Sequence, residues 1–154
     1  RARMKVERLC EKITPWCGDT TFYCVPFTEI QEALRDNCPE ELFTIIMRRL
    51  MMEIAQRICE KNGITALITG ESVGPVYRPV IGMDKSEIVE IARKIDTFDI
   101  SIEPYEDCCT VFTPKHPKTK PILEEVIAAQ NSFDFEPLIQ KAVEETEVKR
   151  FNIC

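Results

Sequence analysis

The apolar run at residues 64–70, I-T-A-L-I-T-G, constrains the fold of this chain more than any other stretch. It follows a long predicted helix and is apolar along most of its length. Such a run between helices is typical of a strand in a parallel sheet that is covered on both faces. Residues 21–27 and 76–81 are two further strand candidates. The alternation of strands with helices predicts an α/β fold with three layers, α/β/α, around a parallel sheet.

The longest predicted helix opens at Pro39 and runs to about residue 61, and Asn62-Gly63 is a good C-terminal stop. Arg48 and Arg49 flank its apolar face on opposite sides. That face is formed by residues at helical spacing, namely Phe43, Ile46, Met47, Leu50, Ile54 and Ile58. It is the clearest predicted core element of the chain.

Shorter helices are predicted on both sides of the longest one. Residues 2–14 form the first, which Pro15 and the turn at Gly18-Asp19 should end, and a short helix follows from Thr28 to about residue 34. Asp84 caps a helix at residues 85–95, with Glu87 in the capping-box position. Two acidic helices at about 121–130 and 135–148 complete the chain. The helix at 85–95 should face inward with Ile88, Ile91, Ala92 and Ile95.

The chain has 154 residues and a net charge of −6, which argues against nonspecific binding of nucleic acid over its whole surface. It contains neither a membrane-spanning apolar run nor a recognisable signal peptide. We therefore predict a cytoplasmic protein with no membrane partner. Because the chain begins at Arg1, we expect it to be a fragment.

Eight cysteines are many for a chain of this length. No C-x-x-C pair occurs, and one histidine is too few for the common zinc patterns, so no metal-ligating residue is predicted. A reducing compartment fits this helix-rich sequence better than a secreted disulfide scaffold does. Most cysteines are therefore expected to be buried as small apolar residues, Cys24 in a strand and Cys59 in a helix among them.

The segment at residues 105–121, Y-E-D-C-C-T-V-F-T-P-K-H-P-K-T-K-P, gathers two adjacent cysteines, the only histidine, three lysines and three prolines. Its prolines predict an extended, stiff loop, and polar loops that carry thiols are common sites of chemistry. A surface loop with incidental cysteines is the alternative. A reactive thiol needs a lowered pKa; His116 and the lysines favour this, whereas Glu106 and Asp107 oppose it.

Five motifs in order resemble the tRNA 4-thiouridine synthases, also called tRNA sulfurtransferases. They are V-P-F-T-E-I-Q (25–31), M-R-R-L-M (47–51), A-L-I-T-G-E-S-V-G (66–74), R-P-V-I-G-M-D-K (78–85) and P-Y-E-D-C-C-T-V-F-T-P-K-H-P-K-T-K-P (104–121). Single pieces such as T-G-E-S are weak signals. The ordered set covers nearly the whole chain and is specific.

The resemblance implies an ATP-dependent enzyme built on the adenine nucleotide α-hydrolase fold of the PP-loop ATP pyrophosphatases. Such an enzyme adenylates the carbonyl of a tRNA uridine, and a persulfide sulfur then displaces AMP. ATP and Mg²⁺, a tRNA substrate and a cysteine desulfurase as sulfur donor are implied. A homodimer and a supply of sulfur for the thiazole of thiamine are further expectations.

The site residues follow from the matching positions. Cys108 is the predicted persulfide carrier, with Cys109 as the alternative one position on. The predicted nucleotide contacts are Arg48, Gly70 and Glu71, and the predicted contacts to tRNA phosphates are Lys115, Lys118 and Lys120.

Two departures from the family limit these expectations. The S-G-G-x-D-S phosphate loop and the RNA-binding domains, which precede the Arg1 position in the family, are absent. Residues 1–154 therefore correspond to the C-terminal part of one ATP-pyrophosphatase domain, incomplete at its N-terminus and inactive alone. The family is also longer after Gly74, by about twenty residues. Either these residues are missing from the protein, or a mobile loop at this point is not included in the sequence, and we favour the mobile loop.

Two other functions stay open at this point. The chain could belong to another PP-loop ATP pyrophosphatase, such as an amidotransferase-type ligase, in which the cysteines are inert. It could also be a noncatalytic interaction module that uses its acidic helices.

Overall fold

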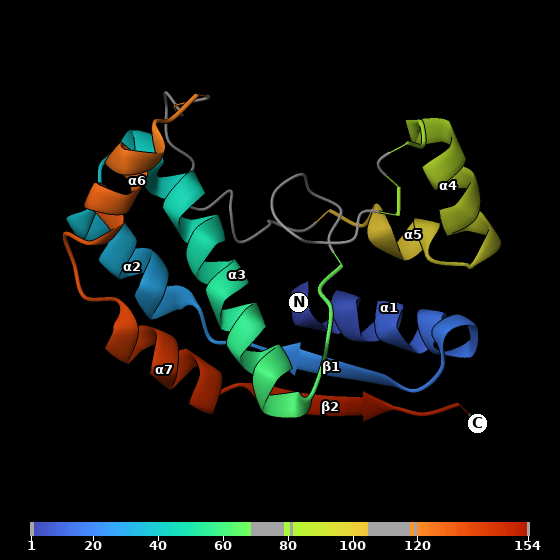
Figure 1. Cartoon of the computed structure of the whole chain (residues 1–154). Coiled ribbons are helices and arrows are strands. Elements are labelled where there is room, and N and C mark those ends of the chain that lie inside the picture. Colours follow the sequence, from blue (N-terminus) through green and yellow to red (C-terminus); the bar gives the residue numbers. More distant parts are fainter. Residues whose placement is uncertain (1, 69–78, 81, 105–117, 119, 154) are drawn as a thin grey trace. The chain divides into compact units, whose positions relative to one another are not determined.

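The computed structural model describes residues 2–68, 79–80, 82–104, 118 and 120–153. These residues form two compact units, each assembled from separate stretches of the chain (Figure 1). Unit 1 comprises residues 1–24, 66–106 and 147–154, and unit 2 comprises residues 25–65 and 107–146. None of the helices in the described ranges is long and apolar enough to cross a membrane.

Unit 2 is a helical body around α3 (Phe43–Asn62). The 3₁₀ turn η1 (Glu40–Leu42) leads into α3, and α2 (Thr28–Asn37), α6 (Leu123–Gln130) and α7 (Glu136–Glu144) pack against it. All six apolar residues predicted for the face of α3 are buried, which confirms that prediction: Phe43, Ile46, Met47, Leu50, Ile54 and Ile58. Gly63 ends the helix with φ 68°, in the left-handed region where glycine is favoured.

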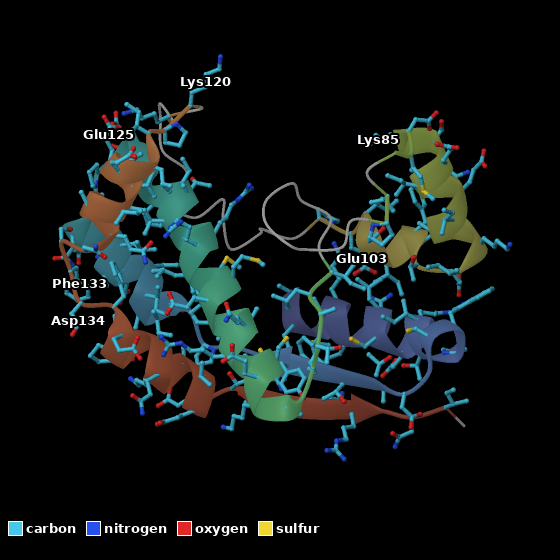
Figure 2. All side chains as sticks on the ribbon, in the orientation of Figure 1. Lys85, Glu103, Lys120, Glu125, Phe133 and Asp134 are labelled. Carbon is cyan, nitrogen blue, oxygen red and sulfur yellow. The ribbon has the colours of Figure 1, made fainter. Side chains whose placement is uncertain are left out.

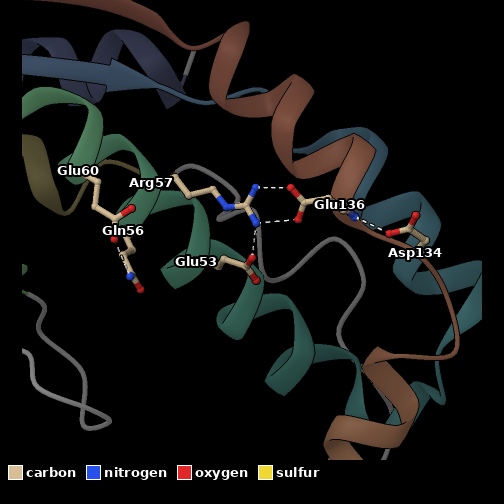
Figure 3. A network of polar contacts seen from close by, with 6 residues as sticks. All are labelled: Glu53, Gln56, Arg57, Glu60, Asp134 and Glu136. Carbon is tan, nitrogen blue, oxygen red and sulfur yellow. Dashed lines mark hydrogen bonds and ion pairs between the residues drawn. The ribbon is translucent and has the colours of Figure 1, made fainter.

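An ionic network joins α3 to α7 within unit 2 (Figure 3). The guanidinium of Arg57 donates to both carboxylate oxygens of Glu136, at 2.6 and 2.7 Å, and to Glu53 at 2.6 Å. This bidentate pair holds the pKa of Glu136 below its usual range. The network fixes the outer surface of the two helices above the apolar core.

Unit 1 contains α1 (Ala2–Cys17), β1 (Thr20–Cys24), α4 (Lys85–Lys94), α5 (Phe98–Ser101) and β2 (Glu147–Phe151). The two strands pair antiparallel, with Thr20 opposite Phe151 and Cys24 opposite Glu147. This two-stranded ladder is the sheet found among the described residues. The parallel three-layer sheet is therefore not confirmed, although the chain combines helices and strands as expected.

Several predicted boundaries are wrong. Helix α1 continues through Pro15 to Cys17, where Gly18 turns the chain with φ 88°. The residues 147–148 predicted as helix belong to β2.

The predicted strand at residues 64–70 is not found in its described part. Residues 64–67 form no helix or strand, and Ile68 makes only an isolated bridge. These residues are not buried, since Ile64 is 43% exposed and Ile68 is 68% exposed. Most of the strand predicted at 76–81 lies outside the described residues.

The cap of α4 is confirmed, but its burial is not. Asp84 accepts hydrogen bonds from the backbone N–H groups of Ser86 and Glu87, and Glu87 accepts from the N–H of Asp84. Ile88 and Ile91, predicted to face inward, remain 38% and 43% exposed. The buried apolar side chains described for unit 1 are few, namely Cys10, Ile100 and Phe151.

Candidate functional site

Most of the predicted loop at residues 105–121 that carries Cys108 and Cys109 (the thiol loop) lies outside the described residues. Cys108, Cys109, Lys115 and His116 belong to residues 105–117, and the structure describes the chain on either side of that segment. Residue 104 precedes it in unit 1, and Lys118 follows it in unit 2. The described parts next to the predicted site are therefore its two flanks.

The chain before the segment is held by α1. Helix α5 ends at Ser101, and the ammonium of Lys5 donates to the backbone carbonyls of Ser101 and Glu103, at 2.8 and 2.9 Å. A cation at the last carbonyls of a helix satisfies groups that have no partner inside the helix. The guanidinium of Arg8 donates to the carboxylate of Glu103 at 2.7 Å. Backbone and side chain of Glu103 are both fixed to one helix.

The chain after the segment is held by η1 and α6. The backbone N–H of Lys118 donates to the carbonyl of Glu41 at 3.1 Å, and its ammonium pairs with the carboxylate of Glu125 and lies 4.0 Å from that of Glu41. The bond to Glu125 raises the pKa of Lys118 above its usual value. Lys120 is instead exposed, and its side chain extends outward (Figure 2).

The predicted nucleotide contacts are only partly described. Arg48 lies on α3 directly after the buried Met47 and is exposed, as the helical spacing predicts. The adjacent Arg49 is also exposed, and it donates to the side-chain oxygen of Gln130 at 2.8 Å. Gly70 and Glu71 lie outside the described residues.

The five described cysteines are free thiols, and they are less buried than expected. Cys10 is buried, Cys17 is exposed, and Cys24, Cys38 and Cys59 are half-buried. Burial raises the pKa of Cys10 and of Cys38, which keeps both in the unreactive thiol form at neutral pH. Cys17 is thus the most accessible thiol of the described part.

No group of three or more His, Cys, Asp or Glu side chains that could hold a metal ion occurs in the described ranges. The expected Mg²⁺ therefore rests on the resemblance alone.

The contacts of Lys5 and Arg8 to Glu103 were not predicted from the sequence. Their partners lie some 95 residues further along the chain, so no local pattern indicates the contact. The one available signal was the basic series Lys5, Arg8 and Lys12 on one side of the first helix. Lys12 pairs with Asp96, which extends the attachment of α1 to the chain beside α5.

The family model described as "Thiamine biosynthesis protein (ThiI)" matches residues 1–77 and 73–135, so the chain belongs to that family. The two matches overlap at residues 73–77, next to the position after Gly74 where the family has a longer segment.

Individual relatives agree with this assignment. A probable tRNA sulfurtransferase of Acetivibrio thermocellus is 50% identical over 167 residues, which take in 96% of this chain and 43% of that protein. One of Clostridium acetobutylicum is 47% identical, with 96% and 44% covered. The chain thus spans less than half the length of these relatives. The 167 aligned positions exceed its 154 residues, so the A. thermocellus protein has additional residues within the aligned region.

The fold of this chain is similar to that of a solved structure from a 4-thiouridine synthetase. A 4-thiouridine synthetase, crystallised in complex with RNA and with bound ATP, superposes with a TM-score of 0.85 and 27% sequence identity. The match covers 98% of this chain and 45% of that one.

Proposed function

We propose that the protein containing this chain is an ATP-dependent tRNA sulfurtransferase that forms 4-thiouridine. The observation that carries the proposal is the match, over nearly the whole chain, to a 4-thiouridine synthetase with bound ATP and RNA. The thiol loop supplies the nucleophile that sulfur transfer requires. A tRNA substrate agrees with the cytoplasmic location expected from the sequence.

The chain would be the C-terminal part of one ATP-pyrophosphatase domain. Unit 1 supports this view because few of its described apolar residues are buried, and in the described part β1 pairs with β2 alone. A strand with one partner leaves the other edge open to a further strand. In the longer protein, we propose, a parallel strand joins β1 and builds the three-layer sheet of the adenine nucleotide α-hydrolase fold.

The proposed reaction has three steps. ATP, as a substrate, transfers AMP to the O4 carbonyl oxygen of uridine, and pyrophosphate leaves. The terminal sulfur of a persulfide on Cys108 attacks C4, and AMP leaves with the oxygen. A second thiol then breaks the sulfur–sulfur bond between Cys108 and the nucleoside, which yields 4-thiouridine and a protein disulfide that an external reductant must reduce.

The chain's own residues would bind and orient the reactants. Arg48 is an exposed cation on the rigid α3 helix and suits the phosphates of ATP, with Gly70 and Glu71 as further proposed contacts. Lys115, Lys118 and Lys120 are proposed to contact tRNA phosphates. The family resemblance also supports four further proposals. They are Mg²⁺ bound with ATP, a cysteine desulfurase as sulfur donor, a homodimer, and a role in thiamine synthesis.

The test uses the full-length protein and tRNA that lacks 4-thiouridine. Replacement of Cys108 by Ser should abolish 4-thiouridine, measured by mass spectrometry of tRNA nucleosides, while ATP and tRNA binding stay nearly unchanged. Cys109→Ser should lose less. Cys17→Ser, at an exposed thiol of α1, is the control and should retain activity.

Two results would contradict this assignment. Loss of activity in Cys109→Ser alone would assign the persulfide to Cys109 instead of Cys108. Full activity in both variants would remove the persulfide role from this loop and favour an ATP pyrophosphatase with inert cysteines.

A further inference from the structure

Helices α4 and α5 and the turn between them, residues 85–103, form a helix pair within unit 1. Helix α5 packs on α1, and α4 packs on α5. In the helix pair, all of which the structure describes, the buried side chains are those of Thr97 and Ile100, and α4 contributes none. Within the described part of unit 1, apolar burial therefore contributes little to holding the helix pair.

Three cations of α1 contact the helix pair instead. Lys5, Arg8 and Lys12 follow one another at spacings of three and four residues, which places them in one row along α1. The ammonium of Lys5 donates to the carbonyls of Ser101 and Glu103, at 2.8 and 2.9 Å. The guanidinium of Arg8 donates to the carboxylate of Glu103 at 2.7 Å, and Glu103 lies between α5 and α1 (Figure 2).

The third cation, Lys12, pairs with Asp96 in the turn between α4 and α5. The N–H of Asp96 donates to the carbonyl of Arg93 at 3.1 Å, and that of Thr97 donates to the carbonyl of Ala92 at 2.9 Å. These two bonds form a Schellman motif, with Asp96 at φ 59° in the position that glycine usually takes. Because a side chain is disfavoured in this conformation, the ion pair with Lys12 explains an aspartate here better than the turn does.

Contacts of this kind are sensitive to ionic strength. The side chains of Arg8 and Lys12 are 50% and 45% exposed, so salt screens their ion pairs. An element with few buried apolar contacts opens locally at a low cost in free energy. Helix α1 has other attachments, since Cys10 is buried and Arg3 pairs with Glu147 of β2. The helix pair can therefore leave α1 while α1 stays on the two strands.

We propose that Lys5, Arg8 and Lys12 form an electrostatic clasp that holds the helix pair on α1, and that the helix pair detaches as one body when ionic strength is raised. The clasp would give unit 1 an element that changes position without unfolding the remainder of the unit. This inference is independent of the proposed function, and its test needs no tRNA.

Hydrogen exchange of the full-length protein tests the proposal. Isolated helices as short as α4 and α5 are marginal in water, so their amides exchange once the helix pair is detached. Raising NaCl from about 0.05 M to about 1 M should speed this exchange, relative to that of α3, by roughly threefold to tenfold, the range for the loss of one or two exposed ion pairs. Arg8→Glu should have a similar effect at low salt and leave a smaller response to added salt.

Two further variants identify the contact responsible. Arg8→Glu/Glu103→Arg should return the exchange of α4 and α5 toward that of the parent. Arg3→Glu is the matched control, because Arg3 lies on the same helix, is 44% exposed and pairs with Glu147 of β2. It should leave the exchange of α4 and α5 unchanged.

The pair of Lys12 and Asp96 provides an independent test by a double-mutant cycle. Asp96→Asn removes the charge and keeps a residue that tolerates the left-handed conformation. It should speed the exchange of α4 and α5 as much as Lys12→Gln does, and the double variant should exchange no faster than either single variant. Additive effects in the double variant would overturn the proposal, as would exchange in the parent that does not respond to salt. Faster exchange in α4 alone, with α5 unchanged, would also contradict detachment as one body.

Discussion

At the residue scale, the exposure of Arg48 and Arg49 follows from the helical spacing. Both are exposed on α3, since each lies off the apolar face. Arg49 also donates to the side-chain oxygen of Gln130 on α6. The spacing could not predict that contact, because Gln130 is 81 residues away in the sequence.

We predict that Arg48→Ala weakens ATP binding to the full-length protein by about tenfold or more, because a hydrogen bond from a charged donor to phosphate is lost. Arg49→Ala should leave ATP affinity unchanged. Titration calorimetry measures both. Equal affinities in the Arg48 variant and the parent would remove Arg48 from the nucleotide site.

The Arg57–Glu136 pair makes a prediction about pH. The pKa of Glu136 is lowered in the folded protein by its bond to Arg57, so the pair stabilises unit 2 at neutral pH and this contribution is lost as pH falls through the folded pKa. Glu136→Gln should therefore destabilise α3 and α7 at pH 7 and make no difference at an acidic pH below the lowered pKa of Glu136. Hydrogen exchange of the two helices at both pH values measures this, with Glu60→Gln as the control, since Glu60 accepts only from the neutral amide of Gln56 in the network shown (Figure 3). A deficit that persists at low pH would contradict the assignment to charge.

At the scale of elements, predictions succeeded where the determining contacts are local. The apolar spacing of α3 and the capping box of α4 depend on residues close together in the sequence, and both predictions are confirmed. Strand β2 was missed because E-T-E-V-K-R consists mostly of good helix formers, and only pairing with residues 20–24 makes it a strand. Pro15 did not end α1. The side-chain hydroxyl of Thr14 donates to the carbonyl of Cys10, and the backbone carbonyl of Thr14 accepts from the N–H of Gly18.

The capping box of α4 is directly testable. Asp84→Ala should cost about 1 kcal/mol of local helix stability, because two N-terminal N–H groups lose their acceptor. Asp84→Asn should retain most of it, since an amide oxygen also accepts these bonds. Exchange rates of the α4 amides in the full-length protein report the difference. Equal rates in the Ala variant and the parent would show that the cap is unimportant there.

At the scale of the whole molecule, the apolar core is distributed unevenly. Most buried apolar residues belong to unit 2, whereas unit 1 leaves Trp16, Ile91 and Ile102 exposed. The sequence did not show this division because each unit is assembled from separated stretches, and helical periodicity is the same whether a face is covered by its own unit or by another part of a longer protein.

We predict that the two units respond separately to a core mutation. Leu50 is fully buried in unit 2, and Leu50→Ala should cost about 2–5 kcal/mol of that unit's stability. The amides of α2, α3 and α7 should exchange faster, and those of β1 and β2 should not change. Met51→Ala, at the neighbouring residue that is 39% exposed, is the matched control. Parallel loss of protection in β1 and β2 would show that the units unfold as one.

The pairing of β1 with β2 also has a consequence for the order of folding. The ladder joins residues 20–24 to residues 147–151, and all of unit 2 lies in the stretch between them. Contacts so distant in sequence form slowly, since a long loop must close before they contribute. During synthesis, β1 leaves the ribosome well before β2 exists, and unit 2 can collapse in that interval. The edge of β1 that pairs with β2 therefore stays unpaired while residues 25–146 are made, and an unpaired edge is prone to aggregation.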